Sequence, residues 1–241
     1  MYIFGVDVSR HNGQIDHVKC AAAGAKFAAS RCTVGDYYID TRWYENHAGF
    51  TAAGVKRLAY LVVVPENSIG QKITAEAHVN LFLKAVENRD LDFPPVLDCE
   101  LPRIHNPGLN VYLTDLITDI CRLLLTEFGD YPIIYTRKTW WDPSVNRKSY
   151  WYQYPLWTAH YTTAAAPLIP FDWLKWDLWQ YSSKGPGHVL GAEEEYIDLN
   201  YMQPDFWQRF VGQDSNPAGN MVSVFLDIED QAYEGELEKI V

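Results

Sequence analysis

Apolar runs and helical spacing alternate along most of the chain. Strand-like apolar runs cover residues 2–8, 26–33, 57–64, 94–100, 131–137, 155–160, 176–181 and 195–200. Several runs are continuously apolar, which is typical of parallel strands covered on both faces. Helical signals separate the first five runs. Between Leu113 and Leu124, for example, apolar residues recur every three or four positions, and Gly129 follows where a helix would end.

From Trp151 onward the helical period fades, and Trp, Tyr, Pro and Gly become frequent. Strands that alternate with helices predict a parallel sheet, and eight strands favour closure into a barrel. We therefore expect an α/β fold, an irregular TIM-like barrel with five β-α units followed by three strands. An open, doubly wound sheet is the alternative.

The last part of the chain has a different composition. Residues 204–241 hold eight acidic and two basic residues, and 212–220 resemble a turn-rich linker before a possible strand at 221–228. The sequence predicts a barrel domain over residues 1–203 and an acidic C-terminal appendage of unknown role over residues 204–241.

Charge and composition exclude several classes of partner. The 241 residues carry a net charge of −11, which argues against nucleic acid, because phosphate binding needs a basic surface. No stretch is apolar enough for membrane insertion, and the N-terminus has no signal-peptide pattern, so we expect synthesis in the cytoplasm. The four cysteines match no zinc-site spacing, and free, buried thiols are expected.

One strand carries two acids separated by a single residue. Side chains alternate faces along a strand, so Asp98 and Glu100 point the same way while Cys99 points the other. Their Cβ atoms would be roughly 6.5–7 Å apart. This spacing suits two carboxyl groups that flank one scissile bond, and the alternative is a strand end with solvated acids.

Two further acids end other predicted strands. Asp7 ends the first run and Asp198 ends the eighth, and these two strands are neighbours in a closed barrel. Active sites of such barrels form at the carboxyl ends of the strands, so four carboxylates would converge on one cleft and raise at least one pKa. Asp227 and Glu229 repeat the spacing of Asp98 and Glu100, but they lie outside the eight-strand pattern.

Aromatic residues give a second indication of function, beside the four acids. Eight of the nine Trp residues lie between positions 140 and 207, and flat rings pack well on the apolar faces of sugars. Candidate substrate-binding residues near strand ends are Tyr60, Tyr135, Trp157, Tyr161, Trp179 and His11. No HExxH pair, phosphate-binding glycine loop or GxSxG elbow occurs, so neither a metal nor a cofactor is predicted.

Short motifs of this chain, taken in their order along the sequence, resemble those of glycoside hydrolase family 25, the Chalaropsis-type lysozymes common among phage endolysins. The resemblance covers roughly residues 1–203, and its pieces include GVDVS at 5–9, PVLDCE at 95–100, LWTAHY at 156–161 and IDLN at 197–200. The chain departs from the family pattern at several positions, among them Arg31 in place of a usual lysine and His11 in place of an aromatic residue.

The resemblance implies an N-acetylmuramidase that cleaves the β-1,4 bond between N-acetylmuramic acid and N-acetylglucosamine in bacterial peptidoglycan. It implies that Glu100 donates the proton and that Asp98 stabilises the acetamido group or the transition state. Asp7 and Asp198 would complete the cleft. Whether the acetamido group or a carboxylate is the nucleophile stays open. The resemblance also implies release from a phage- or prophage-infected cell before the protein acts on the wall.

Two other functions fit the same residues. A non-catalytic glycan-binding module could retain such a cleft, and a hydrolase of chitin-like N-acetylated glycans could use the same acids.

Overall fold

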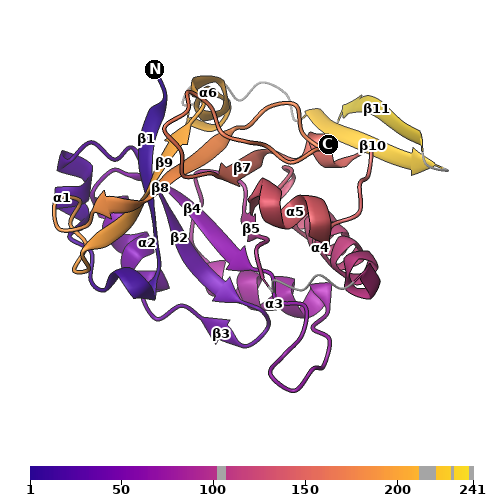
Figure 1. Cartoon of the computed structure of the whole chain (residues 1–241), viewed down its shortest axis with the longest axis horizontal. Coiled ribbons are helices and arrows are strands. Elements are labelled where there is room, and N and C mark those ends of the chain that lie inside the picture. Colours follow the sequence, from indigo (N-terminus) through magenta and orange to yellow (C-terminus); the bar gives the residue numbers. More distant parts are fainter. Residues whose placement is uncertain (102–106, 212–220, 229–230, 239–241) are drawn as a thin grey trace.

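The computed structural model describes residues 1–101, 107–211, 221–228 and 231–238. Eight strands follow one another around a closed barrel, as predicted, because β1 pairs with both β2 and β9 (Figure 1). The strands of the barrel are β1 (Ile3–Val8), β2 (Phe27–Val34), β4 (Lys56–Val62), β5 (Val96–Asp98), β6 (Ile133–Thr136), β7 (Leu156–Ala159), β8 (Leu178–Pro186) and β9 (Tyr196–Met202).

Five helices separate the first six barrel strands, which confirms the predicted β-α units. They are α1 (His17–Ala22), α2 (Trp43–Ala52), α3 (Ala75–Val86), α4 (Pro107–Phe128) and α5 (Lys138–Ser144). Gly129 follows α4 with φ of 75°, a left-handed conformation that glycine adopts without steric cost. No helix connects β7 to β8 or β8 to β9.

Three short elements lie outside this plan. A small strand, β3 (Tyr38–Ile39), pairs antiparallel with the end of β2, and the sequence pattern did not predict it. Single turns of 3-10 helix follow β1 at Arg10–Asn12 and precede β7 at Trp151–Gln153.

The last barrel strand runs against the others. β9 is antiparallel to both β8 and β1, whereas the other neighbouring barrel strands are parallel. The loop from β8 to β9 is short, and only an antiparallel partner can be reached without a crossover connection. Asp198 therefore does not end its strand as predicted. It lies near the start of β9, at the end of the barrel where the parallel strands finish.

Side-chain alternation divides the core into an inner and an outer layer. Inside the barrel, Phe27, Leu58 and Val96 pack together. Outside it, strand residues such as Leu97 pack with the helices around the sheet. Cys99 belongs to this outer layer, so it points away from the cleft, as the strand pattern predicted. All four cysteines are free and buried.

A short helix closes the opposite end of the barrel. α6 (Pro204–Val211) follows β9 and inserts Phe206, which is 5% exposed, beside Phe93 and Phe210. The first turns of the predicted appendage therefore pack on the barrel. Beyond them, β10 (Met221–Ile228) and β11 (Gln231–Glu238) form an antiparallel hairpin, while the predicted linker at 212–220 lies outside the described residues.

We expect Phe206→Ala to lower the free energy of unfolding by about 3 kcal/mol, because it removes a buried ring and leaves a cavity. Urea denaturation measures this change. Gln208→Ala, on the exposed side of the same helix, is the matched control and is expected to leave stability unchanged. Equal, small effects of both substitutions would show that α6 contributes nothing to the stability of the barrel.

Candidate active site

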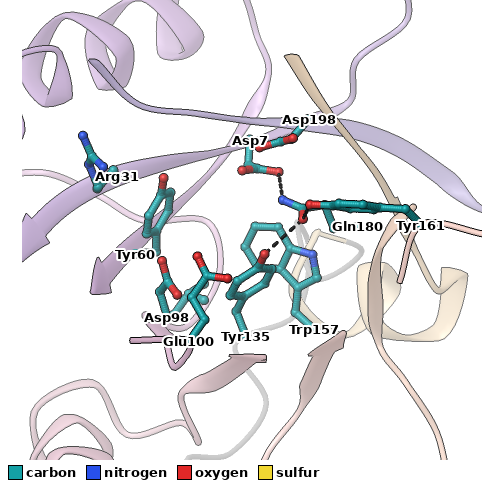
Figure 2. Close-up of a pocket in the computed structure, with 11 residues that line it drawn as sticks. Asp7, Arg31, Tyr60, Asp98, Glu100, Tyr135, Trp157, Tyr161, Gln180 and Asp198 are labelled. Carbon is teal, nitrogen blue, oxygen red and sulfur yellow. Dashed lines mark hydrogen bonds between the residues drawn. The ribbon is translucent and has the colours of Figure 1, made fainter. Parts of the chain in front are cut away.

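The four acids singled out in the sequence line one cleft at the end of the barrel where the parallel strands finish. The cleft has a volume of about 190 Å³. Figure 2 shows the carboxyl groups of Asp7, Asp98, Glu100 and Asp198 around this space. The residues that line it are Asp7, Arg31, Tyr60, Val96, Asp98, Glu100, Tyr135, Trp157, Tyr161, Gln180 and Asp198.

Asp7 and Asp198 meet because their strands are paired. They are opposite each other in the antiparallel register of β1 and β9, so their side chains project from the same face. Two like charges on paired, buried positions repel each other, which favours a proton shared between the two carboxyl groups. Burial raises the pKa of Asp198 to about 8, and the neighbouring charge of Asp7 adds to this shift.

Two side-chain amides hold Asp7. Gln180 Nε2 donates to Asp7 Oδ2 at 2.9 Å, and Asn200 Nδ2 donates to the same oxygen at 2.7 Å. Burial raises the pKa of Asp7, while these two hydrogen bonds oppose the shift. Asp7 is thus a fixed acceptor at the back of the cleft, with one oxygen committed to the protein.

Aromatic side chains in turn hold the two amides. Tyr135 and Tyr161 donate their hydroxyls to Gln180 Oε1 at 3.0 and 2.7 Å. Trp157 Nε1 donates to Asn200 Oδ1 at 3.0 Å. This network orients both amides with their nitrogens toward Asp7, because their oxygens are already occupied.

Asp98 lies on the floor of the cleft at the end of β5 and is 8% exposed. Burial raises its pKa well above the ordinary value, and the charges of Glu100 and Asp7 raise it further, while Arg31 opposes them. Within the described residues, Asp98 Oδ1 has no hydrogen-bond partner. A buried acceptor without a donor is costly, so this oxygen is suited to a donor supplied by a ligand.

Glu100 is more open than Asp98. Its side chain is 32% exposed, and Arg137 lies beside it with 3.6 Å between Nη2 and Oε2. The cleft therefore combines an accessible carboxyl with a buried one two residues earlier on the same chain segment.

We expect the shared proton to make the stability of the folded protein depend on pH. The unfolded chain loses the Asp198 proton near its ordinary pKa of 3.8, whereas the folded chain keeps it until about pH 8. Between these values the folded state binds more protons, so the free energy of unfolding falls as pH rises. Melting temperatures from pH 5 to 8 should therefore decline, and Asp198→Asn should flatten the decline.

Asp36→Asn, at an exposed position outside the cleft, is the control for this series and should keep the wild-type slope. An unchanged slope in Asp198→Asn would contradict the shared proton.

Four of the predicted binding residues line the cleft: Tyr60, Tyr135, Trp157 and Tyr161. Trp157 is only 2% exposed, so it supports the floor and has no free ring face for a sugar. Tyr161 stands at the rim with 55% of its surface exposed and can offer its ring face. Tyr60 lies deeper, where its hydroxyl is 3.5 Å from the carbonyl oxygen of Val8.

The structure places two predicted residues outside the cleft. Trp179 points to the outer layer, because Leu178 and Gln180 occupy the inward positions of β8; its Nε1 donates to the carbonyl of His160. His11 is exposed in the turn after β1 and does not line the cleft.

Sequence reasoning missed two polar residues that line the cleft, Arg31 and Gln180. Gln180 follows the inward-facing Leu178 by two residues, so the alternation of β8 could have identified it. Arg31 belongs to a strand whose register shifts between Arg31 and Thr33, which weakens any argument from alternation.

The described part of the chain contains no group of three or more His, Cys, Asp or Glu side chains placed to hold a metal ion. Among the described helices, none combines the length and apolar character that a membrane crossing requires.

Three comparisons place this architecture among known proteins. The model of Glycosyl hydrolases family 25 matches residues 6–188. Lysozyme M1 of Streptomyces globisporus is 32% identical over 207 residues, which cover 81% of this chain and 66% of that protein. The chain thus spans about two thirds of the length of this relative.

Solved structures agree with this fold. The bacterial lysozyme from Streptomyces coelicolor aligns with a TM-score of 0.71 and 27% identity, covering 84% of this chain and 93% of that one. The CTP1L endolysin aligns with a TM-score of 0.71 over 88% of this chain and 71% of that one, and its 24% identity supports the fold alone. With the family model matched over most of the barrel, the chain belongs to glycosyl hydrolase family 25.

Proposed function

We propose that this protein is an N-acetylmuramidase that hydrolyses the β-1,4 bond between N-acetylmuramic acid and N-acetylglucosamine in peptidoglycan. The observation that carries the proposal is the convergence of Asp7, Asp98, Glu100 and Asp198 on one cleft in a chain of this family. A lysozyme is among its relatives, which favours the same substrate.

In this proposal Glu100 is the proton donor. Its carboxyl is exposed enough to exchange its proton with water, and the cleft holds it beside the floor where the sugar would lie. Protonation of the glycosidic oxygen turns the leaving sugar into a neutral alcohol, which lowers the barrier for bond cleavage.

Asp98 would bind the acetamido group of the sugar whose bond breaks. Its Oδ1 lacks a partner within the described residues, and an acetamido N–H would satisfy it. A charge on Asp98 would also stabilise positive charge that develops on the sugar ring in the transition state. Asp7 and Asp198 would form the opposite wall of the cleft.

The test is the identity of the new reducing end. Purified peptidoglycan is digested, the soluble fragments are reduced with borohydride, and mass spectrometry identifies the reduced sugar. We expect N-acetylmuramic acid at that end. N-acetylglucosamine there would instead mean a glucosaminidase, and turnover of chitin oligomers without any turnover of peptidoglycan would favour the chitin-like alternative.

We also propose that the protein acts on bacterial cell walls after release from the cell that makes it, as an endolysin does. Expression inside a bacterium should then leave cells intact until the membrane is permeabilised, and turbidity should fall rapidly after that step. Lysis that begins without permeabilisation would contradict the proposal.

A further inference from the structure

Arg31 is the one positively charged side chain among the residues that line the cleft in the described part of the chain. Four carboxyl groups surround the same space, and the whole chain carries a net charge of −11. Glu100 is already paired with Arg137, so Arg31 is the side chain lining the cleft that is best suited to attract an acidic group on a ligand.

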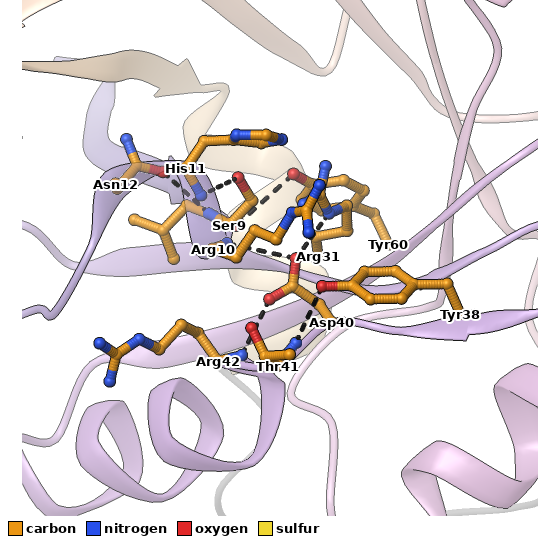
Figure 3. Close-up of polar contacts among 11 residues, drawn as sticks. Ser9, Arg10, His11, Asn12, Arg31, Tyr38, Asp40, Thr41, Arg42 and Tyr60 are labelled. Atoms are coloured by element: carbon orange, nitrogen blue, oxygen red, sulfur yellow. Dashed lines mark hydrogen bonds and ion pairs between the residues drawn. The ribbon is translucent and has the colours of Figure 1, made fainter.

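A buried carboxylate holds Arg31 in place. Arg31 Nε donates to Asp40 Oδ2 at 2.6 Å, and Asp40 is 1% exposed (Figure 3). Asp40 also accepts from the backbone N–H of Arg10 at 3.2 Å and from that of Arg42 at 2.9 Å. Asp40 thus connects the turn after β1, strand β2 and the start of α2, which fixes the position of the guanidinium.

Most of the hydrogen-bonding capacity of Arg31 remains unused. A guanidinium carries five N–H donors, and the contact with Asp40 engages Nε. Within the described residues the two terminal nitrogens form no hydrogen bond or ion pair, although the side chain is only 13% exposed. These donors are fixed in advance and suit a carbonyl or carboxylate acceptor.

The strand order places Arg31 at a defined distance from Asp98. Arg31 is paired with Tyr60 across β2 and β4, and Tyr60 is paired with Val96 across β4 and β5, so Asp98 lies two strands away and two residues further along. Strand spacings of about 4.8 Å and residue steps of about 3.3 Å then put roughly 12 Å between the Cα atoms of Arg31 and Asp98. In muramic acid the lactyl group at C3 is adjacent to the acetamido group at C2. If Asp98 binds the acetamido group, the lactyl group can extend toward Arg31.

We propose that Arg31 binds the lactyl acyl oxygens of N-acetylmuramic acid and so sets the preference for this sugar over N-acetylglucosamine at the position beside Asp98. The inference rests on the proposed function, because it concerns the same cleft and the same glycan. The interaction is a charge-assisted hydrogen bond, which is bidentate when the lactyl group is a free carboxylate.

The experiment compares two tetrasaccharides by titration calorimetry. One alternates N-acetylglucosamine and N-acetylmuramic acid with free lactyl carboxylates, and the other contains only N-acetylglucosamine. Both are titrated into the Glu100→Gln variant, so that turnover does not interfere. We expect the muramic ligand to bind at least about tenfold more tightly, and Arg31→Met in the same background to abolish or reverse that preference.

Three controls keep the result interpretable. Unchanged binding of the N-acetylglucosamine ligand by the Arg31→Met protein shows that the cleft is intact. Arg31→Lys, which keeps a cation for Asp40 but loses the planar fork, should also weaken the preference. Arg42→Met removes a guanidinium that pairs with Glu45 outside the cleft, and it should leave the preference unchanged.

An unchanged preference in Arg31→Met, or equal weakening of both ligands, would overturn the inference. This readout is binding alone, whereas the proposed function is tested separately by the fragments that the wild type releases. If the wild type releases no fragments with N-acetylmuramic acid at the reducing end, the proposed function is contradicted. The binding preference measured for Arg31→Met still decides the inference about Arg31 separately.

Discussion

The Glu100→Gln variant is expected to lose about 10³-fold in kcat on peptidoglycan, because an amide has no acidic proton that it can transfer to the glycosidic oxygen. The substitution preserves the size of the side chain and its place at the edge of the cleft. Turbidity loss of a cell-wall suspension gives a first reading, and quantified soluble fragments give the rate.

The same variant should fold like the wild type. Glu100 is 32% exposed and contacts Arg137 at 3.6 Å, and exposed ion pairs of this kind contribute about 0–1 kcal/mol. Glu45→Gln is a matched control, because it breaks the exposed ion pair with Arg42 outside the cleft. Full activity in Glu45→Gln together with near-complete loss in Glu100→Gln locates the effect in the cleft. Retained wall lysis by Glu100→Gln would favour the non-catalytic module.

Asp98→Asn is expected to lower kcat by roughly 10²–10³-fold, because a carboxyl can ionise as positive charge develops on the reacting sugar, whereas an amide cannot supply a negative charge. Its effect on stability should have the opposite sign. Asp98 is buried beside Glu100 and Asp7, and burial raises its pKa well above the ordinary value. A carboxyl of this kind is destabilising once it must ionise, so its removal should raise the melting temperature.

The pH dependence of the stability difference between Asp98→Asn and the wild type distinguishes this explanation from a simple packing effect. The folded protein holds the Asp98 proton more tightly than the unfolded chain does, so the wild type loses stability as pH rises above the ordinary pKa of 3.8. The stability gained in Asp98→Asn should therefore be larger at pH 8 than at pH 5. A variant that is inactive and also strongly destabilised at both pH values would mean that the carboxylate is needed for folding.

Much of the barrel could be predicted because its signals are local. Strand-like apolar runs marked all eight strands, and helical spacing such as that between Leu113 and Leu124 marked the helices between the first five. The one-residue spacing of Asp98 and Glu100 placed both in the cleft and Cys99 outside it. β5 itself ends at Asp98, two residues before the predicted end, but the alternation of side chains continues through Glu100.

The remainder depends on contacts between distant segments. The direction of β9 follows from a short hairpin connection, so Asp198 reaches the cleft at the start of its strand. Trp179 was expected in the cleft from its position near a strand end, yet the register of β8 places it outside. The ion pair of Arg31 with Asp40 joins residues nine positions apart through a turn and β3, for which the sequence gives no periodic signal.

The most direct test of the central claim is a crystal structure of the Glu100→Gln variant with a tetrasaccharide of alternating N-acetylglucosamine and N-acetylmuramic acid. The account predicts the glycan in this cleft, with the side chain of residue 100 within about 3 Å of a glycosidic oxygen on the muramic acid. It also predicts an acetamido group against Asp98. A glycan bound on another surface, or in the cleft with residue 100 far from every glycosidic oxygen, would contradict it.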